Sequence, residues 1–200
     1  MGYHRAGFEV VGVDIAPQPN YPCCFVQADA LEFLRTSSLV FDAIHASPPC
    51  QAYSYAQRLR GNEHPDLIGP TRDLILARTV PYVIENVVGA RAKLRDPIML
   101  CGAMFPPLRV YRHRLFETGG GFRATAPPHP EHLAPQVKMG RRPADGEWVQ
   151  AVGNFSGVSE ARDAMGIPWA TRNELSEAIP PAYTEHIGRQ LLAHLNQRAG

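Results

Sequence analysis

The chain has 200 residues, 44% of them hydrophobic and 20% charged, which is enough to bury the core of one domain with at most a small second lobe. Its formal net charge of +1 neither requires nor excludes a nucleic-acid partner. The four cysteines include no Cys-x-x-Cys pair, which argues against a zinc finger, and they are too few for a chain of this length to be a disulfide scaffold. No apolar run is long enough to cross a membrane, so we expect a soluble cytoplasmic protein.

The first 35 residues predict two short strands that end near acidic side chains. A helix over residues 1–6 ends at Gly7 and leads into a strand over residues 9–15. A second strand precedes Asp29, whose side chain can cap the helix that follows it. Asp14, near the end of the first strand, is suited to bind the hydroxyl groups of a ribose. From the sequence alone, a role in the turn that follows is the simpler explanation of Asp14.

Cys50 follows an unusual strand ending. The apolar run over residues 41–46 stops at Ser47-Pro48-Pro49, and two consecutive prolines cannot continue a central strand. We therefore predict that Cys50 lies on a turn directly after a buried strand. Open α/β sheets bind ligands beyond the carboxyl ends of their strands, so a nucleophilic thiol would be well placed there. Taken alone, however, a single cysteine is more often an inert core residue.

A second strand of the same kind, over residues 81–89, carries Glu85 near its end. Thr71 is expected to cap a helix over residues 71–78 that connects the two strands. A helical crossover makes the strands parallel neighbours, so Cys50 and Glu85 should emerge at the same edge of the sheet. Residues 51–70 form a long polar loop, which is often a functional feature in a compact domain. An ordinary surface loop would have the same composition.

Arginines are concentrated in the following stretch. Residues 108–117 alternate as a strand does, with Arg112 and Arg114 on one face, where two guanidinium groups need anionic partners if they are buried. Residues 91–114 hold six Lys and Arg residues and one acidic residue. This cluster indicates either a surface for nucleic acid or a solvated face, and the sequence does not distinguish them.

The last part of the chain combines a break in composition with two helices. Residues 119–146 are rich in Gly, Pro and His, and His129, Glu131 and His132 lie close together in them. Because no second pair of ligands accompanies them, an exposed loop is favoured and no metal site is expected. A helix over residues 159–166 follows, and the final helix carries an apolar stripe of Tyr183, Ile187, Leu191 and Leu195.

The order of three motifs resembles the DNA cytosine-5 methyltransferase family. They are Ser-Pro-Pro-Cys-Gln at residues 47–51, Glu-Asn-Val at 85–87 and Arg-x-Arg at 112–114, and the resemblance covers residues 2–192 apart from 119–149. It implies an α/β fold with the Rossmann-like S-adenosylmethionine-dependent methyltransferase sheet flanked by helices, lacking the first strand and its glycine-rich loop. It also implies a catalytic and cofactor-binding core at 1–118, a very small target-recognition insertion at 119–150, and C-terminal helices at 151–200 that complete the core.

The resemblance also assigns roles to individual residues. Cys50 would be the thiolate that adds to C6 of cytosine and Glu85 the acid at N3, with Arg112 holding the carboxylate and Arg114 reaching the base. S-adenosylmethionine would methylate C5 of a cytosine flipped out of double-stranded DNA. The cofactor contacts would come from Asp14, Ile15, Asp29, Ala30 and Pro49. The DNA contacts would come from Gln51, Ser54, Arg58, Arg60, Arg141 and Arg142.

Two alternatives to an active methyltransferase remain. The first is a DNA-binding remnant of such an enzyme that has lost cofactor affinity together with the glycine-rich loop. The second is a cysteine hydrolase with His45 or His113 as its base, which requires that one of these side chains converge on Cys50. We rank the methyltransferase first and the hydrolase last.

Overall fold

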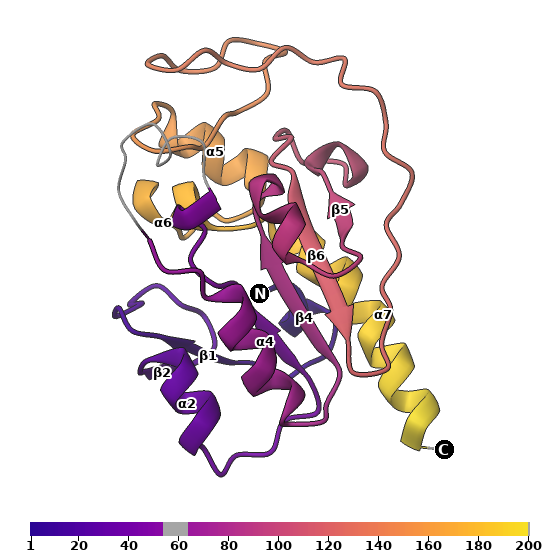
Figure 1. Cartoon of the computed structure of the whole chain (residues 1–200). Coiled ribbons are helices and arrows are strands. Elements are labelled where there is room, and N and C mark those ends of the chain that lie inside the picture. The colour runs from indigo at the N-terminus through magenta and orange to yellow at the C-terminus, as the bar shows by residue number, and fades with distance from the viewer. Residues whose placement is uncertain (54–63, 200) are drawn as a thin grey trace. The chain divides into compact units, whose positions relative to one another are not determined.

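The chain divides into two compact units, which we call the sheet unit and the helix unit. The computed structural model describes residues 1–53 and 64–199 (Figure 1). The sheet unit consists of Val10–Met99, Arg114–Thr125 and Gln190–Gly200. The helix unit consists of Met1–Glu9, Leu100–His113 and Ala126–Arg189. The segment expected to be an insertion, residues 119–150, therefore contributes its first residues to the sheet unit and the rest to the helix unit.

Parallel pairing of short strands organises the sheet unit. Strands β1 (Val11–Asp14) and β2 (Cys24–Gln27) form a parallel pair. A second sheet has the strand order β3-β4-β6-β5. Its strands are β3 (Ile44–Ala46), β4 (Tyr82–Asn86), β5 (Ile98–Leu100) and β6 (Arg114–Gly119). Strand β3 is parallel to β4, whereas β6 is antiparallel to β4. This mixed sheet, flanked by helices, confirms the predicted α/β class.

Two helices of the sheet unit, α2 (Ala30–Thr36) and α4 (Ile68–Leu76), lie side by side (Figure 1). Asp29 caps α2 as predicted, because its Oδ1 accepts a hydrogen bond of 2.9 Å from the Glu32 N–H. Helix α4 connects β3 to β4, which confirms the crossover. It begins at Ile68, so the prediction that Thr71 caps it is wrong. Pro70 is tolerated in the first turn because the N–H that it lacks has no partner inside the helix there.

The core of the sheet unit forms around β4, in which every residue is buried. Apolar residues from α4, β4 and β6 fill this core, among them Ile68, Ile75, Ile84 and Leu115, all with 0% exposure. A strand buried along its whole length is typical of the centre of an α/β sheet. The apolar run that predicted this strand therefore reflects its central position.

A buried ion pair joins α4 to β6. The Arg72 guanidinium donates to both carboxylate oxygens of Glu117, at 2.7 and 2.6 Å, and Glu117 is fully buried. The Tyr82 hydroxyl and the Arg95 N–H also donate to this carboxylate. Burial alone would raise the pKa of Glu117, but the hydrogen bonds and charge of Arg72 outweigh it, so the pKa lies below its ordinary value.

The predicted strand over residues 108–117 is shorter than expected. Strand β6 begins at Arg114, and Arg112 has a φ of +34°, which no regular strand contains. The Tyr183 hydroxyl donates to the carbonyl oxygens of Tyr111 and Arg112, at 3.1 and 3.0 Å. Tyr183 is fully buried in the helix unit, so the position of its hydroxyl is fixed by the surrounding core. Its two hydrogen bonds therefore hold the backbone at Tyr111 and Arg112 in the irregular conformation.

The helix unit contains the helices α1 (Gly2–Arg5), α5 (Val158–Met165) and α6 (Arg172–Glu177) and the start of α7 (Pro181–Ala199). Helix α5 ends at Gly166 with a φ of +68°, as predicted. The predicted stripe of α7 is buried at Tyr183, Ile187 and Leu191. Gly2 packs so closely on α7 that an added Cβ would lie 2.2 Å from the Pro181 carbonyl oxygen. Only glycine fits at this contact.

The connecting segments contain little regular structure. Three short 3-10 turns, η1 (Gln51–Tyr53), η2 (Val88–Lys93) and η3 (Gly102–Met104), follow β3, β4 and β5. Residues 120–157, all of which the structure describes, form no helix or strand beyond isolated bridges such as Gln136 with Trp148. Among the described residues, no helix is both long enough and apolar enough to pass through a membrane.

Candidate active site

Cys50 lies where the sequence predicts it, on a turn directly after a strand. Strand β3 ends at Ala46, Pro48 is buried, and the half-buried Cys50 is followed at once by η1. The Tyr53 N–H donates to the Cys50 carbonyl oxygen at 3.0 Å and closes this turn. The thiol therefore lies on a short hydrogen-bonded turn between β3 and η1.

Glu85 lies near the end of the neighbouring strand. In the parallel pairing of β3 with β4, Ala46 is opposite Ile84, so Glu85 and the turn to Cys50 are at the same end of the two strands. This confirms the prediction that both residues emerge at one edge of the sheet. Ligands of α/β sheets bind at this end of parallel strands.

Asn86 connects the two strand ends. Its side-chain Nδ2 donates to the Pro48 carbonyl oxygen at 2.9 Å, and its Oδ1 accepts from the Val87 N–H at 2.9 Å. Asn86 is 1% exposed, so both ends of its amide are satisfied inside the protein. The sequence analysis assigned no role to this residue. A polar amide directly after the carboxylate of a buried strand is the pattern that could have indicated it.

The Glu85 carboxylate is buried beside a guanidinium group. Glu85 is opposite Phe116 across β4 and β6, and Arg114 is the next residue on the same face of β6. The Arg114 Nε lies 3.1 Å from Glu85 Oε1. The side chain of Arg114 is 16% exposed and that of Glu85 is 8% exposed. From the sequence, we expected Arg112 to hold the Glu85 carboxylate and Arg114 to reach the target cytosine. The structure adds Arg114 to the partners of the carboxylate.

Arg112 belongs to the helix unit. Its guanidinium donates to the carbonyl oxygens of Ala151 and Ser176, each at 2.7 Å. These bonds hold the arginine against the backbone before α5 and in the last turn of α6. Its predicted role toward Glu85 stays a prediction.

His45 and His113 do not support a hydrolase. His45 lies on β3, with its Nε2 3.1 Å from Ser47 Oγ, and burial lowers its pKa to about 4, which makes it a weak base. His113 Nε2 lies 3.1 Å from His129 Nε2, within a cluster of histidines around Cys101. Neither arrangement is the Cys50–histidine pair that this alternative requires.

The predicted cofactor residues lie at the carboxyl ends of β1, β2 and β3. Asp14 Oδ1 accepts from the Ala16 N–H at 2.8 Å, so the turn-forming role is real, and Asp29 caps α2. Ile15 is 70% exposed. Ala30, in the first turn of α2, and Pro49, in the Cys50 turn, are exposed as well. The apolar side chain of Ile15 is thus available to a flat ligand.

The predicted DNA contacts are only partly described. Gln51 is exposed in η1, whereas Ser54, Arg58 and Arg60 lie outside the described residues. In the helix unit, the Arg141 guanidinium binds both carboxylate oxygens of Glu147 and lowers the pKa of Glu147 to about 2. Arg142 Nε lies 3.9 Å from Glu160 Oε1. A phosphate would have to compete with these carboxylates for both arginines.

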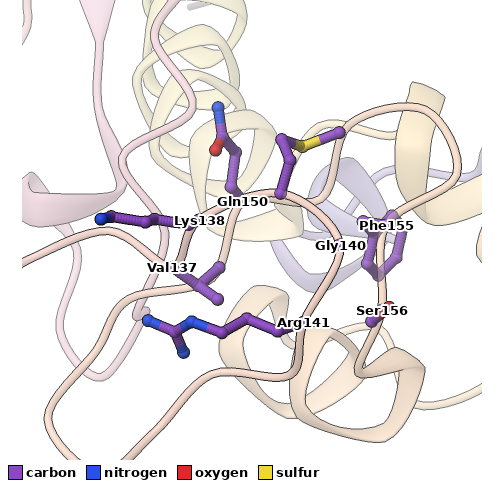
Figure 2. A pocket seen from close by; sticks show the side chains of 8 residues that line it. Val137, Lys138, Gly140, Arg141, Gln150, Phe155 and Ser156 are labelled. Atoms are coloured by element: carbon purple, nitrogen blue, oxygen red, sulfur yellow. The ribbon is translucent and has the colours of Figure 1, made fainter.

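Two hollows lie in the helix unit. The first, shown in Figure 2, is too small to enclose a water molecule. It is lined by Val137, Lys138, Met139, Gly140, Arg141, Gln150, Phe155 and Ser156. The second has a volume of about 170 Å³ and is lined by Arg109, residues 143–149 and Glu160. Neither hollow includes Cys50 or Glu85, so the candidate site rests on its strand-end geometry.

Comparison with known proteins finds no family model that matches the chain, and a search of curated proteins also finds no match.

Proposed function

We propose that the chain is the catalytic core of a DNA cytosine-5 methyltransferase. The observation that carries this proposal is the parallel pairing of β3 with β4, which brings the Cys50 turn and Glu85 to one sheet edge. The hydrogen bond from Asn86 to the Pro48 carbonyl oxygen fixes the turn relative to the carboxylate. A nucleophile and an acid that serve one pyrimidine must be held in this way.

The proposed reaction uses a thiolate and a proton donor on opposite parts of the cytosine ring. Cys50 Sγ adds to C6 while Glu85 protonates N3, and C5 becomes nucleophilic enough to take the methyl group of S-adenosylmethionine. Methyl transfer releases S-adenosylhomocysteine. A base then removes the proton from C5, the electron pair of that C–H bond expels the sulfur from C6, and N3 returns its proton to Glu85, which restores the ring. Arg114, 3.1 Å from Glu85, orients the carboxylate. Because C6 is inaccessible in a stacked duplex, the base must be flipped out of the helix.

The strand order supports the resemblance on the cofactor side. In a doubly wound sheet of order 3-2-1-4-5-6, the first strand lies between the second and the fourth. Here the orders are β1-β2 and β3-β4-β6-β5, and among the described residues β1 pairs only with β2 and β3 only with β4. One further strand between β1 and β3 would give the order 3-2-1-4-5 of that sheet, with β6 and then β5 beyond it. Asp14 and Ile15 would then flank the ribose and adenine of S-adenosylmethionine.

A DNA-binding remnant without cofactor affinity is the second candidate. The observation that favours it is that, among the described residues, no strand pairs with both β1 and β3, where the resemblance places the strand and glycine-rich loop that receive the methionine part of the cofactor. Such a protein would keep its arginines and bind DNA without methylating it.

Transfer of labelled methyl groups to duplex DNA separates the two candidates. The chain is compared with a version that carries an added N-terminal strand and glycine-rich loop, each as wild type and as Cys50→Ser. Transfer by either wild-type protein that Cys50→Ser abolishes supports the methyltransferase chemistry. Transfer only by the extended protein identifies the 200-residue chain as the remnant, and no transfer by either protein contradicts the proposal.

A further inference from the structure

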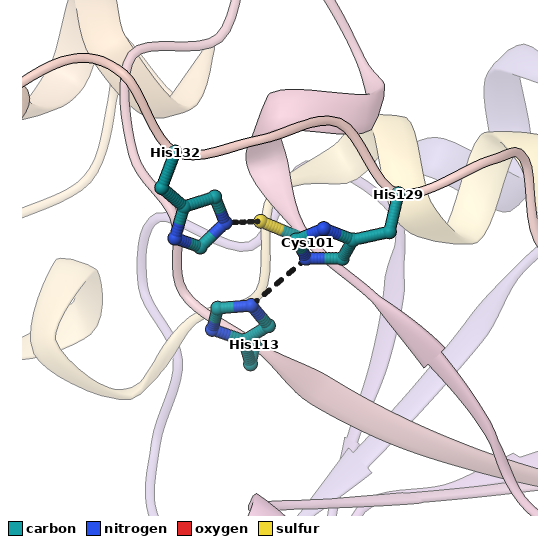
Figure 3. Close-up of side chains that lie close together, drawn as sticks. All are labelled: Cys101, His113, His129 and His132. Atoms are coloured by element: carbon teal, nitrogen blue, oxygen red, sulfur yellow. Dashed lines mark hydrogen bonds between the residues drawn. The ribbon is translucent and has the colours of Figure 1, made fainter.

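Four side chains that can bind a metal converge in the helix unit. They are Cys101, His113, His129 and His132, and their ligand atoms all lie within 4.8 Å of one another (Figure 3). Cys101 Sγ lies 3.3 Å from His132 Nε2, and His113 Nε2 lies 3.1 Å from His129 Nε2. From the sequence, no metal site is expected at His129 and His132, because no second pair of ligands accompanies them. The structure supplies that pair from residues 101 and 113.

The distances fit a tetrahedral zinc ion. Zinc–nitrogen bonds of about 2.0–2.1 Å and a zinc–sulfur bond of about 2.3 Å place neighbouring ligand atoms about 3.3 to 3.6 Å apart. The Cys101–His132 and His113–His129 separations are 3.3 and 3.1 Å, and all the others lie within 4.8 Å. Figure 3 shows the three rings and the sulfur facing a common centre. Small shifts of the rings would give regular coordination.

The tautomer of His129 favours metal binding. Its Nδ1 lies 2.8 Å from the Pro130 carbonyl oxygen, which can only accept a hydrogen bond. Nδ1 therefore carries the proton, and in the neutral ring Nε2 presents its lone pair to the cluster. A backbone carbonyl that fixes the second nitrogen in this way is typical of histidine ligands.

Backbone and ring contacts hold Cys101 and His132 in position. The Gly102 N–H donates to the Tyr111 carbonyl oxygen at 2.8 Å, and an added Cβ at Gly102 would lie 1.7 Å from the Val110 carbonyl oxygen. This close approach, which only glycine permits, brings Cys101 next to the segment of His113. The His132 ring stacks on Tyr111 with centroids 3.7 Å apart. Both ligands are thus positioned by groups that do not bind the metal.

The donor atoms and their places in the fold suit a soft cation. Cys101 is buried and His113 half-buried, whereas His129 and His132 are exposed, so an ion could reach the cluster from solvent. Cys101 is fully buried, and its thiolate would need a positive charge beside it. One thiolate with three imidazoles suits zinc better than the oxygen-seeking ions calcium and magnesium.

We propose that Cys101, His113, His129 and His132 bind one zinc ion in a structural site. Four protein ligands fill the tetrahedron and leave no position for a water or a substrate, as in structural zinc sites. The ion would fix residues 129–132, within a segment of 38 residues (120–157) that has no helix or strand, to the chain around Cys101 and His113. This proposal is independent of methyl transfer, because it concerns none of the residues assigned to that reaction.

Metal analysis of the purified chain tests the proposal. We expect one zinc per chain in the wild type and in the control variants Cys24→Ser and His4→Asn, whose residues are exposed and lie outside the cluster. Cys101→Ser and the double variant His129→Asn, His132→Asn should retain less than about a tenth of the zinc after dialysis, because loss of a ligand weakens binding at least 10-fold. Equal zinc in these variants and the controls would overturn the proposal.

Cobalt substitution and chelation measure metal binding by the wild-type protein itself. Their results therefore cannot be explained by a variant that fails to fold. Cobalt-loaded wild type should show the visible bands of tetrahedral Co²⁺ and a sulfur-to-cobalt charge-transfer band, and Cys101→Ser should lose the latter. Removing zinc with a chelator should lower the melting temperature of the wild type by about 5 °C or more, and added zinc should restore it. A folded wild type that binds neither metal, or that melts at the same temperature with and without zinc, would contradict a structural zinc site.

Discussion

Two cysteines of this chain lie in surroundings built in different ways. Cys50 is placed by regular structure, since a parallel strand pair and a double proline decide where its thiol lies. Cys101 is placed by irregular structure, since its three histidine neighbours come from segments without helices or strands. The comparison teaches that strand pairing brings the candidate catalytic groups to one edge in a way that sequence periodicity reveals. The proposed metal site depends instead on contacts between loops, which leave no period in the sequence.

We expect the largest effects on methyl transfer and on zinc content from two single variants, Cys50→Ser and Cys101→Ser. Cys50→Ser should lower methyl transfer by about 10,000-fold or more, because the nucleophile is lost, and should leave the zinc content unchanged. Cys101→Ser should lose zinc. Methyl transfer and zinc content are measured on both variants, with Cys24→Ser as the control. If Cys50→Ser lost zinc and kept activity, the assignment of the two cysteines would be reversed.

The sheet beneath the candidate site should depend on the buried Glu117. Glu117→Gln leaves the Arg72 guanidinium buried without its counter-charge, which should lower the free energy of unfolding by about 3–5 kcal/mol. Urea denaturation measures this loss. The control is Glu32→Gln, which removes the exposed partner of Arg35 and should change stability little. Equal effects of the two variants would show that the buried pair does not stabilise the sheet.

Acid should destabilise the strand that precedes Cys50 before it affects Glu117. Because burial lowers the pKa of His45 to about 4, the unfolded state binds more protons as the pH falls from about 6.5 to about 4, and about 3 kcal/mol of stability is lost over that range. The pKa of Glu117 is also lowered, so its contribution is present above about pH 4.3 and is lost as the pH falls further.

Replacing His45 by a side chain that does not titrate isolates the first step. Urea denaturation of His45→Gln at pH 7, 5 and 4 should show a smaller loss of stability than the wild type, and His4→Gln should behave as the wild type does. An unchanged pH dependence in His45→Gln would contradict a lowered pKa of the half-buried His45.

Asn86 should position the Cys50 turn without taking part in the reaction. Asn86→Ala leaves the Pro48 carbonyl oxygen without its donor, which should lower the free energy of unfolding by about 1–3 kcal/mol. We expect kcat to fall about 10- to 100-fold, because the thiol is displaced, while KM for DNA stays the same. Asn154→Ala, an exposed amide of the helix unit, is the control. A change in KM alone would assign Asn86 to DNA binding.

The sequence predicts the strand-end site because its elements are local. Asp29 predicts the start of α2, and the prolines at 48 and 49 predict the end of β3. Apolar runs predict the strands β3 and β4 themselves. Two strands joined by a helix then follow a simple rule of parallel pairing. These features require no knowledge of distant contacts, and the structure confirms them.

The remaining features depend on residues that are far apart in the chain. The break at Arg112 follows from the hydroxyl of Tyr183, 71 residues later, so the alternation of residues 108–117 predicts a strand that tertiary contacts interrupt. The metal cluster joins Cys101 to His132, 31 residues away, through the close approach of Gly102 to Val110. Spacing between these residues carries no period from which the cluster could have been predicted.

The proposed attack by Cys50 is tested most directly by trapping it on DNA. Duplex DNA that contains 5-fluorocytosine is incubated with S-adenosylmethionine and either the chain or its extended version, and covalent complexes are digested and mapped by mass spectrometry. Fluorine at C5 prevents the elimination that would release the sulfur, so we predict a complex through Cys50 that requires S-adenosylmethionine and is absent in Cys50→Ser. No complex with either protein, or a complex through a different cysteine, would contradict the account.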